Sequence, residues 1–337
     1  MNEVSSPARA RDDGAMAAQC ELVRAGERRA VAKTITLLES TRPDLAAEGQ
    51  AILEQLVPLT GRACRVGITG APGVGKSTFI ESLGLQLLGT GHRVAVLAID
   101  PTSPLTGGSI LGDKTRMERL AQDERAFIRP SPSGGSLGGV AHHTREAMLV
   151  CEAAGYDVVI VETVGIGQSE VAVASMVDSF VVLLQPGAGD ELQGIKKGVV
   201  ELADLLVVNK ADGEGRAAAE RTQSEYRHAL ELLRVGSAGW RPPVLCVSGR
   251  TGEGITEVWA AVGAHQDALQ ATGELAAKRR GQALAWMWSL VEEGLRETFR
   301  SHAAVSRLIP RLEREVEDQK STPAAAARAL LAAFRAS

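Results

Sequence analysis

The sequence predicts a doubly wound α/β fold with a mostly parallel sheet, preceded and followed by helices. Between residues 62 and 269, short apolar runs alternate with longer amphipathic stretches, a pattern typical of strands joined by crossover helices. Several runs are nearly continuous in Val, Ile and Leu, as expected of strands buried on both faces. The first run also leads directly into a glycine-rich loop and a helical stretch. We therefore expect a ligand site at the carboxyl ends of the strands.

The individual elements follow from the residue pattern. Strands are expected at Cys64–Thr69, Arg93–Asp100, Ala126–Arg129, Asp157–Thr163, Ser179–Gln185, Asp204–Asn209 and Val244–Ser248. Helices are expected between them at Phe79–Leu88, Asp113–Ala121, Val140–Ala154, Leu192–Leu202, Glu214–Leu233 and Ile255–Leu269.

Helical extensions flank the α/β region. Apolar residues recur at helical spacing over 31–38 and 45–59, and Pro43 suits the first turn of the second helix. Apolar stripes appear again after Thr272. The expected organisation is a disordered tail over 1–17, an N-terminal helical extension over 18–61, the α/β domain over 62–271 and a helical arm over 272–337.

The composition narrows the class of protein. The chain has 337 residues, and 45% of them are hydrophobic, which is enough for a substantial core. A net charge of -4 gives no electrostatic reason to expect nucleic-acid or membrane binding. The four cysteines are scattered without metal-ligand spacing, which favours free thiols in a reducing compartment. With no apolar run as long as a bilayer span and no signal-peptide core, we expect a cytoplasmic location.

The glycine-rich loop has the residues of a phosphate-binding loop. Its glycines allow the backbone to turn tightly and to bring N–H groups close to phosphate oxygens. Lys76 is placed to contact the β- and γ-phosphates, and the Ser77 hydroxyl is placed to bind Mg²⁺. The strand, loop and helix order therefore predicts a P-loop NTPase fold. The loop consists of Gly70, Ala71, Pro72, Gly73, Val74, Gly75, Lys76, Ser77 and Thr78.

A second motif predicts the base of the nucleotide. The strand that ends near Val208 leads into Asn209, Lys210, Ala211 and Asp212, the Asn-Lys-x-Asp pattern that reads guanine. Asp212 can accept hydrogen bonds from the guanine N1–H and exocyclic amine, donors that adenine lacks. The last strand leads into Ser248, Gly249 and Arg250, where GTPases usually place Ser-Ala to complete the base pocket through backbone N–H groups. Gly249 departs from that pattern but keeps the N–H.

Acidic residues in the loops could surround a metal ion. Glu162 ends a strand shortly before Gly165, the place of the acidic residue that senses Mg²⁺ and the γ-phosphate, and it is open whether it binds the metal directly or through water. The loop from Asp100 to Met117 has the Gly-, Ser- and Pro-rich composition of a switch loop. Asp113 could serve that loop, cap a helix, or do both.

A second polar loop, from Gln185 to Lys196, is either functional or a solvated face. It carries Asp190, Glu191 and Lys196.

Together these motifs resemble the MeaB family, the G-protein chaperones of adenosylcobalamin-dependent acyl-CoA mutases. The most distinctive part is the string from Thr106 to Met117, and the strings around Glu162–Glu170 and Asn209–Asp212 agree with it. The resemblance covers roughly residues 30–295. It implies a GTPase that binds GTP, GDP and Mg²⁺, gates cofactor loading onto methylmalonyl-CoA mutase or a relative, and protects or rescues that mutase.

The resemblance also implies roles for individual residues. Asp100, Asp113 and Glu162 match acidic residues placed around Mg²⁺, and with Lys76 they form the expected catalytic set. The loop that carries Asp190, Glu191 and Lys196 matches a third switch that signals to the mutase. Gln168 lies in the second switch, two residues too far from the glycine to be assigned the water-positioning role. The C-terminal arm is expected to form a homodimer.

Three alternatives remain open at this stage. Related GTPases insert metals, but they carry Cys/His motifs, and here only the adjacent pair His142-His143 is present. A kinase acting on a periplasmic transport system would not need a guanine pocket. A scaffold that binds GTP without turnover would not need the complete phosphate loop and acidic positions. No arginine finger can be named, so we expect weak intrinsic hydrolysis that the mutase stimulates.

Overall fold

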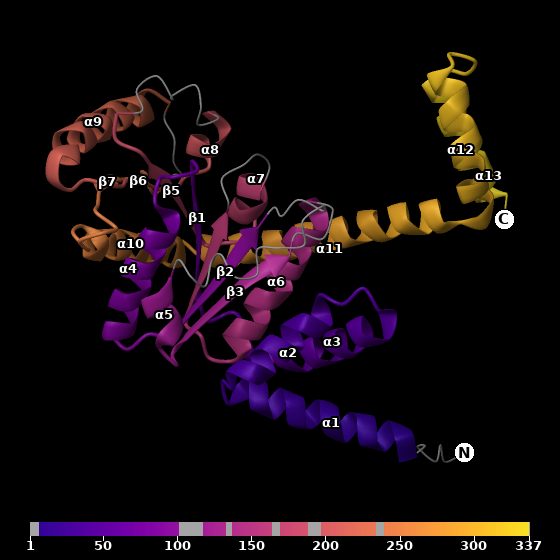
Figure 1. Cartoon of the computed structure of the whole chain (residues 1–337), viewed down its shortest axis with the longest axis horizontal. Coiled ribbons are helices and arrows are strands. Elements are labelled where there is room, and N and C mark those ends of the chain that lie inside the picture. The colour runs from indigo at the N-terminus through magenta and orange to yellow at the C-terminus, as the bar shows by residue number, and fades with distance from the viewer. Residues whose placement is uncertain are drawn as a thin grey trace. The chain divides into compact units, whose positions relative to one another are not determined.

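The computed structural model describes residues 7–100, 117–132, 137–163, 169–187, 197–233 and 239–336 (Figure 1). Seven strands form one sheet in the order β3-β2-β4-β1-β5-β6-β7, and every neighbouring pair is parallel. The strands are β1 Cys64–Gly70, β2 Val94–Asp100, β3 Ala126–Pro132, β4 Val158–Thr163, β5 Ser179–Leu184, β6 Leu205–Val208 and β7 Val244–Cys246. The predicted fold class is confirmed, and each expected strand is present within a few residues of its expected bounds.

The helices of the α/β region pack on both faces of this sheet. They are α4 Lys76–Gly89, α5 Glu118–Gln122, α6 Leu137–Ala153, α7 Ser169–Ala174, α8 Lys197–Glu201, α9 Arg216–Leu233 and α10 Ile255–Ala271. Helix α7 was not expected from the sequence, and the predicted starts of α5 and α8 lie outside the described residues.

Successive side chains along the strands point to opposite faces of the sheet, and this produces two apolar layers. In β2, Ala95, Leu97 and Ile99 face one cluster while Val94 and Val96 face the other. The first cluster also includes residues from the N-terminal helices, α6, α7 and α9, and the second includes residues from α4, α5 and α10. Since successive side chains point to opposite faces, a strand with helices on both sides must be apolar throughout. The continuous apolar runs in the sequence are explained by this double burial.

Three helices precede the sheet: α1 Pro7–Arg24, α2 Arg28–Leu38 and α3 Pro43–Leu56, the last followed by a short 3-10 turn at Val57–Leu59. The sequence predicted two helices and a disordered tail over 1–17, whereas α1 begins at Pro7. The Gln19 amide of α1 donates hydrogen bonds to the Ala30 carbonyl (2.9 Å) and the Thr34 hydroxyl (3.0 Å) of α2. Those contacts depend on residues distant in the chain, so the local pattern gave no signal for them.

The chain divides into two units, residues 1–280 and 281–337. The sequence placed the start of the C-terminal arm at 272, a few residues before this division. Helix α11 Glu274–Ser301 begins in the first unit, and the second unit also contains α12 Ala303–Glu317 and α13 Pro323–Arg335. Within the second unit, Phe299 and Phe334 meet edge to face with ring centroids 5.3 Å apart. None of the described helices has the length and apolar character needed to cross a membrane.

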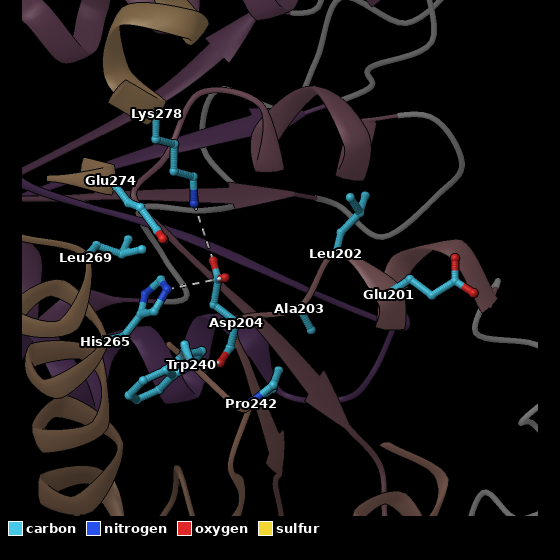
Figure 2. A pocket seen from close by; sticks show the side chains of 10 residues that line it. All are labelled: Glu201, Leu202, Ala203, Asp204, Trp240, Pro242, His265, Leu269, Glu274 and Lys278. Atoms are coloured by element: carbon cyan, nitrogen blue, oxygen red, sulfur yellow. Dashed lines mark hydrogen bonds and ion pairs between the residues drawn. The ribbon is translucent and has the colours of Figure 1, made fainter. Parts of the chain in front are cut away.

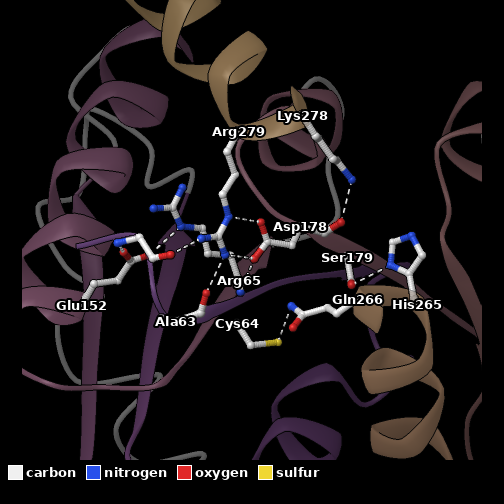
Figure 3. Close-up of polar contacts among 11 residues, drawn as sticks. Ala63, Cys64, Arg65, Glu152, Asp178, Ser179, His265, Gln266, Lys278 and Arg279 are labelled. Atoms are coloured by element: carbon white, nitrogen blue, oxygen red, sulfur yellow. Dashed lines mark hydrogen bonds and ion pairs between the residues drawn. The ribbon is translucent and has the colours of Figure 1, made fainter. Parts of the chain in front are cut away.

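The first turns of α11 are anchored to the sheet by a buried ion network (Figure 3). Asp178, whose side chain is fully buried, accepts hydrogen bonds from Arg279 Nε (2.8 Å) and Nη2 (2.7 Å) and from the Arg65 backbone N–H (2.8 Å). Arg279 also donates to the Gly61 and Ala63 carbonyls. Glu152 of α6 accepts from the Arg65 side chain and the Gly61 N–H. This network joins α6, β1, the start of β5 and α11.

A hollow of about 290 Å³ lies beside the amino end of β6 (Figure 2). Its residues include Asp204, Trp240 and His265. His265 is buried; its Nδ1 is 2.8 Å from the Ser179 hydroxyl and its Nε2 is 3.4 Å from Asp204 Oδ1. Burial lowers the pKa of His265, although the Asp204 carboxylate opposes that effect. Ser179 is completely buried, so this Ser-His-Asp chain supports the packing of α10 on the sheet and offers no accessible nucleophile.

Candidate functional site

The phosphate loop connects β1 to α4 at the carboxyl edge of the sheet. Gly75, which immediately precedes α4, has a left-handed φ of 94°, and Gly73 has φ 78°, so both positions favour glycine. A Cβ at Gly70 would lie 2.6 Å from the Leu183 carbonyl oxygen of β5. The Lys76 ammonium donates to the Gly70 carbonyl (2.7 Å) and the Ala71 carbonyl (3.2 Å). The lysine is thus folded back over the loop, and its charge lies against the loop backbone.

The predicted guanine motif is hydrogen-bonded to the phosphate loop. The Asn209 amide donates to the Val74 carbonyl (2.9 Å), and its oxygen accepts from the Gly249 N–H (3.0 Å). The Lys210 ammonium donates to the Gly73 carbonyl (2.6 Å). Lys210 itself has a positive φ of 62°, an uncommon backbone conformation for a side-chain-bearing residue. Three segments that are far apart in the sequence therefore form one site.

Asp212 has partners on both carboxylate oxygens. Its Oδ1 accepts a hydrogen bond from the Ser248 hydroxyl (2.8 Å), and its Oδ2 forms an ion pair with the Arg250 guanidinium. The Ser248 hydrogen bond, followed by the Arg250 contact, holds the pKa of Asp212 below its usual range. The carboxylate is therefore the ionised acceptor that a guanine edge requires.

The glycine at position 249 has a packing explanation. A Cβ there would lie 3.0 Å from the Phe79 backbone nitrogen and 3.1 Å from its Cα, because the loop lies directly against α4. The Ser82 hydroxyl of the same helix donates to the Gly249 carbonyl. Glycine in place of the usual alanine therefore permits this close approach and still leaves the N–H bonded to Asn209.

Glu162 and Ser77, each predicted to lie near the metal, are in contact. Strand β4 pairs with β1 so that Glu162 is opposite Ile68, and the Ser77 hydroxyl donates to Glu162 Oε1 at 3.2 Å. Glu162 is 6% exposed, and a hydroxyl with a carboxylate is the hard oxygen donor set that Mg²⁺ prefers. Beside them the Thr69 and Thr163 hydroxyls are 2.6 Å apart. The residues present fit a magnesium ion.

Several predicted residues lie outside the described part of the chain. Asp100 ends β2 at the same edge of the sheet, but its side chain is not described. The other predicted residues outside the description are Asp113, Gln168, Asp190, Glu191 and Lys196.

Sequence reasoning missed two features of this region. One is Ser82, whose role depends on the packing of α4 against the loop at 249. The other is Glu170 in the first turn of α7, which is 7% exposed and whose Oε2 has no hydrogen-bond partner among the residues that the structure describes. A carboxylate two residues after Gln168 was the available signal for it.

Comparison with known proteins places the chain in a family. The family model described as methylmalonyl Co-A mutase-associated GTPase MeaB matches residues 31–304. The chain belongs to the MeaB family. It is 57% identical over 310 residues to a protein of Caulobacter vibrioides named as a GTPase, with 92% of this chain and 95% of that protein covered. It is 49% identical to GTPase ArgK of Escherichia coli, covering 84% of this chain and 85% of that protein.

A mammalian relative and a solved structure are also similar to this chain. The mitochondrial methylmalonic aciduria type A homolog of Mus musculus is 49% identical, with 92% of this chain and 77% of that protein covered. A crystal structure described as LAO/AO transport system kinase is 37% identical, covers 99% of both chains and has a TM-score of 0.77. The family and the α/β P-loop fold predicted from the sequence are confirmed, and so is the prediction that the protein is a GTPase.

Proposed function

We propose that this GTPase gates the loading of adenosylcobalamin onto an adenosylcobalamin-dependent acyl-CoA mutase, and protects or reactivates that mutase. The observation that carries the proposal is the family match over residues 31–304, because the family is described as mutase-associated. The methylmalonic aciduria type A homologs, similar over 92% of this chain, support methylmalonyl-CoA mutase or a relative as the partner.

The described residues account for nucleotide binding. Lys76 and the N–H groups at the start of α4 offer positive charge to the phosphates, while Asp212 accepts from the base. The hydrogen bonds from Asn209 and Lys210 to the phosphate loop fix the base pocket relative to the phosphate pocket. Phosphoryl transfer needs little covalent chemistry from the protein, so this positioning is its main contribution to hydrolysis.

Ser77 and Glu162 would hold a magnesium ion, with Asp100 and Asp113 as further proposed acidic neighbours. When bound, the ion would neutralise charge on the β- and γ-phosphate oxygens. Asp190, Glu191 and Lys196 are proposed as the loop that signals to the mutase. Because no arginine finger is identified, we propose weak hydrolysis by the protein alone and faster hydrolysis with the mutase.

The C-terminal helices are proposed to form a homodimer. The part of α11 that lies in the second unit exposes large apolar side chains at helical spacing: Leu284 is 58% exposed, Trp288 60% and Leu295 61%. A face of this kind marks an interaction surface. A second copy would cover it through an isologous two-fold contact, the commonest arrangement of homo-oligomers.

Hydrolysis measurements test the proposal directly. The purified protein would be assayed for GTP turnover alone and with each candidate acyl-CoA mutase, with an unrelated cobalamin-binding protein as control. Stimulation by one mutase alone, together with a nucleotide-dependent rate of adenosylcobalamin transfer to it, would support the proposal. Robust basal turnover with no stimulation would contradict it and favour metal insertion. Transfer of the γ-phosphate to a transport protein would instead favour a kinase.

A further inference from the structure

Arg250 contacts the residue that must recognise the base. Its guanidinium forms an ion pair with Asp212 Oδ2, while 77% of its side chain is exposed. Asp212 is much less exposed, at 16% for its side chain. The guanine edge carries two donors, N1–H and the exocyclic amine, which suit the two oxygens of one carboxylate. The base and Arg250 therefore present donors to the same acceptor.

The other partner of Asp212 is fixed, and Arg250 is the one that can move. The Ser248 side chain is buried, and its hydroxyl donates to Asp212 Oδ1 while its oxygen accepts from the Thr251 N–H at 3.1 Å. Displacing Ser248 would break both hydrogen bonds inside the loop. Displacing Arg250 breaks one exposed ion pair, which contributes little because solvent screens it and the long side chain regains freedom.

We propose that Arg250 competes with the guanine base for Asp212 and thereby speeds nucleotide release. When the base leaves, Asp212 keeps the hydrogen bond from Ser248 but loses those from the base, and the loss of donors to a carboxylate is costly. Arg250 replaces one of those donors, at Oδ2, and lowers the free-energy cost of release. The GTPase would in this way have a built-in element that limits its affinity for guanine nucleotides. This role concerns nucleotide binding alone and does not depend on which mutase is the partner.

Nucleotide binding to the full-length Arg250→Ala and Arg250→Gln variants tests this role. We expect both variants to bind a fluorescent GDP analogue about two- to fivefold more tightly, mainly through slower release, because an exposed pair is worth no more than about a fivefold factor. Arg216→Ala is the matched control. Arg216 is an exposed arginine that pairs with Glu253 (3.0 Å) and Glu220 (3.4 Å). Its replacement by alanine therefore removes one positive charge, as in Arg250→Ala, without touching Asp212.

Salt supplies the second readout. The difference between Arg250→Ala and the unaltered protein should shrink at about 1 M salt, where charges are screened within roughly 3 Å. Weaker GDP binding in the Arg250 variants would mean that Arg250 holds the nucleotide, which overturns the proposal. An equal gain in GDP affinity in Arg216→Ala would overturn it as well, because the effect would then come from the loss of any positive charge.

Discussion

Removing Arg279 should destabilise the protein far more than removing the arginine beside it. Asp178 accepts two hydrogen bonds from Arg279 and one from the Arg65 backbone, and its side chain is fully buried (Figure 3). In Arg279→Met the apolar stem is kept, but the carboxylate loses its countercharge, and the Gly61 and Ala63 carbonyls lose a donor. Breaking a buried pair in this way typically costs about 3–5 kcal/mol. For a domain of this size that corresponds to a fall in melting temperature of roughly 6–20 °C.

The assay is thermal unfolding followed by circular dichroism, with Arg280→Met as the control because Arg280 is exposed. The double variant Asp178→Asn/Arg279→Met should recover part of the loss, since it removes the unpaired buried charge. A fall of less than about 2 °C in Arg279→Met, equivalent to under 1 kcal/mol, would refute the reasoning. It would mean that water reaches Asp178 when the arginine is absent.

Three further predictions concern the site, the hollow and the arm. Lys76→Ala should weaken GTP binding by roughly tenfold or more, measured by equilibrium titration, because a charged donor is lost. The lowered pKa of His265 means that the unfolded chain binds more protons, so stability should fall as pH drops below about 6.5. The free energy of unfolding of His265→Asn, measured in urea, should fall less between pH 7.5 and 5.5 than that of the unaltered protein. An equal fall in both proteins would contradict this. Trp288→Glu should convert the proposed dimer to monomer in sedimentation while GDP binding is kept, whereas Ser289→Glu should stay dimeric.

The functional site was predictable where a short stretch of sequence specifies its chemistry. The phosphate loop needs glycines and a lysine at fixed spacing, and the guanine motif needs Asn209 and Asp212 at fixed spacing after a strand, so both could be recognised from short strings. Ser77 and Glu162 were each assigned to the metal from separate motifs, and their contact is consistent with the rule that parallel strands bring their carboxyl ends to one edge. The strands were predictable for a similar reason, since double burial produces long Val and Ile runs.

What sequence reasoning missed depends on contacts between distant residues. Asp178 and Arg279 are separated by 101 positions, and nothing near either residue indicates the other. The helix α7 is only six residues long, too short for a clear apolar period. The start of α1 at Pro7 was missed because that segment is polar and was interpreted as a tail. The reason for glycine at 249 required the position of Phe79, which only the packing of α4 provides.

The ion network also has a consequence for where the protein can be cut. By sequence, the junction between Gly61 and Arg62 separates a helical extension from the α/β domain. By hydrogen bonding it belongs to the α/β domain, because Gly61 donates to Glu152 and accepts from Arg279. A shortened chain that starts at Arg62 would leave both of those charged groups short of a partner. The N-terminal helices also share one apolar cluster with the sheet and α6, so a design or proteolysis study should keep α1 to the start of α11, residues 7–280, together.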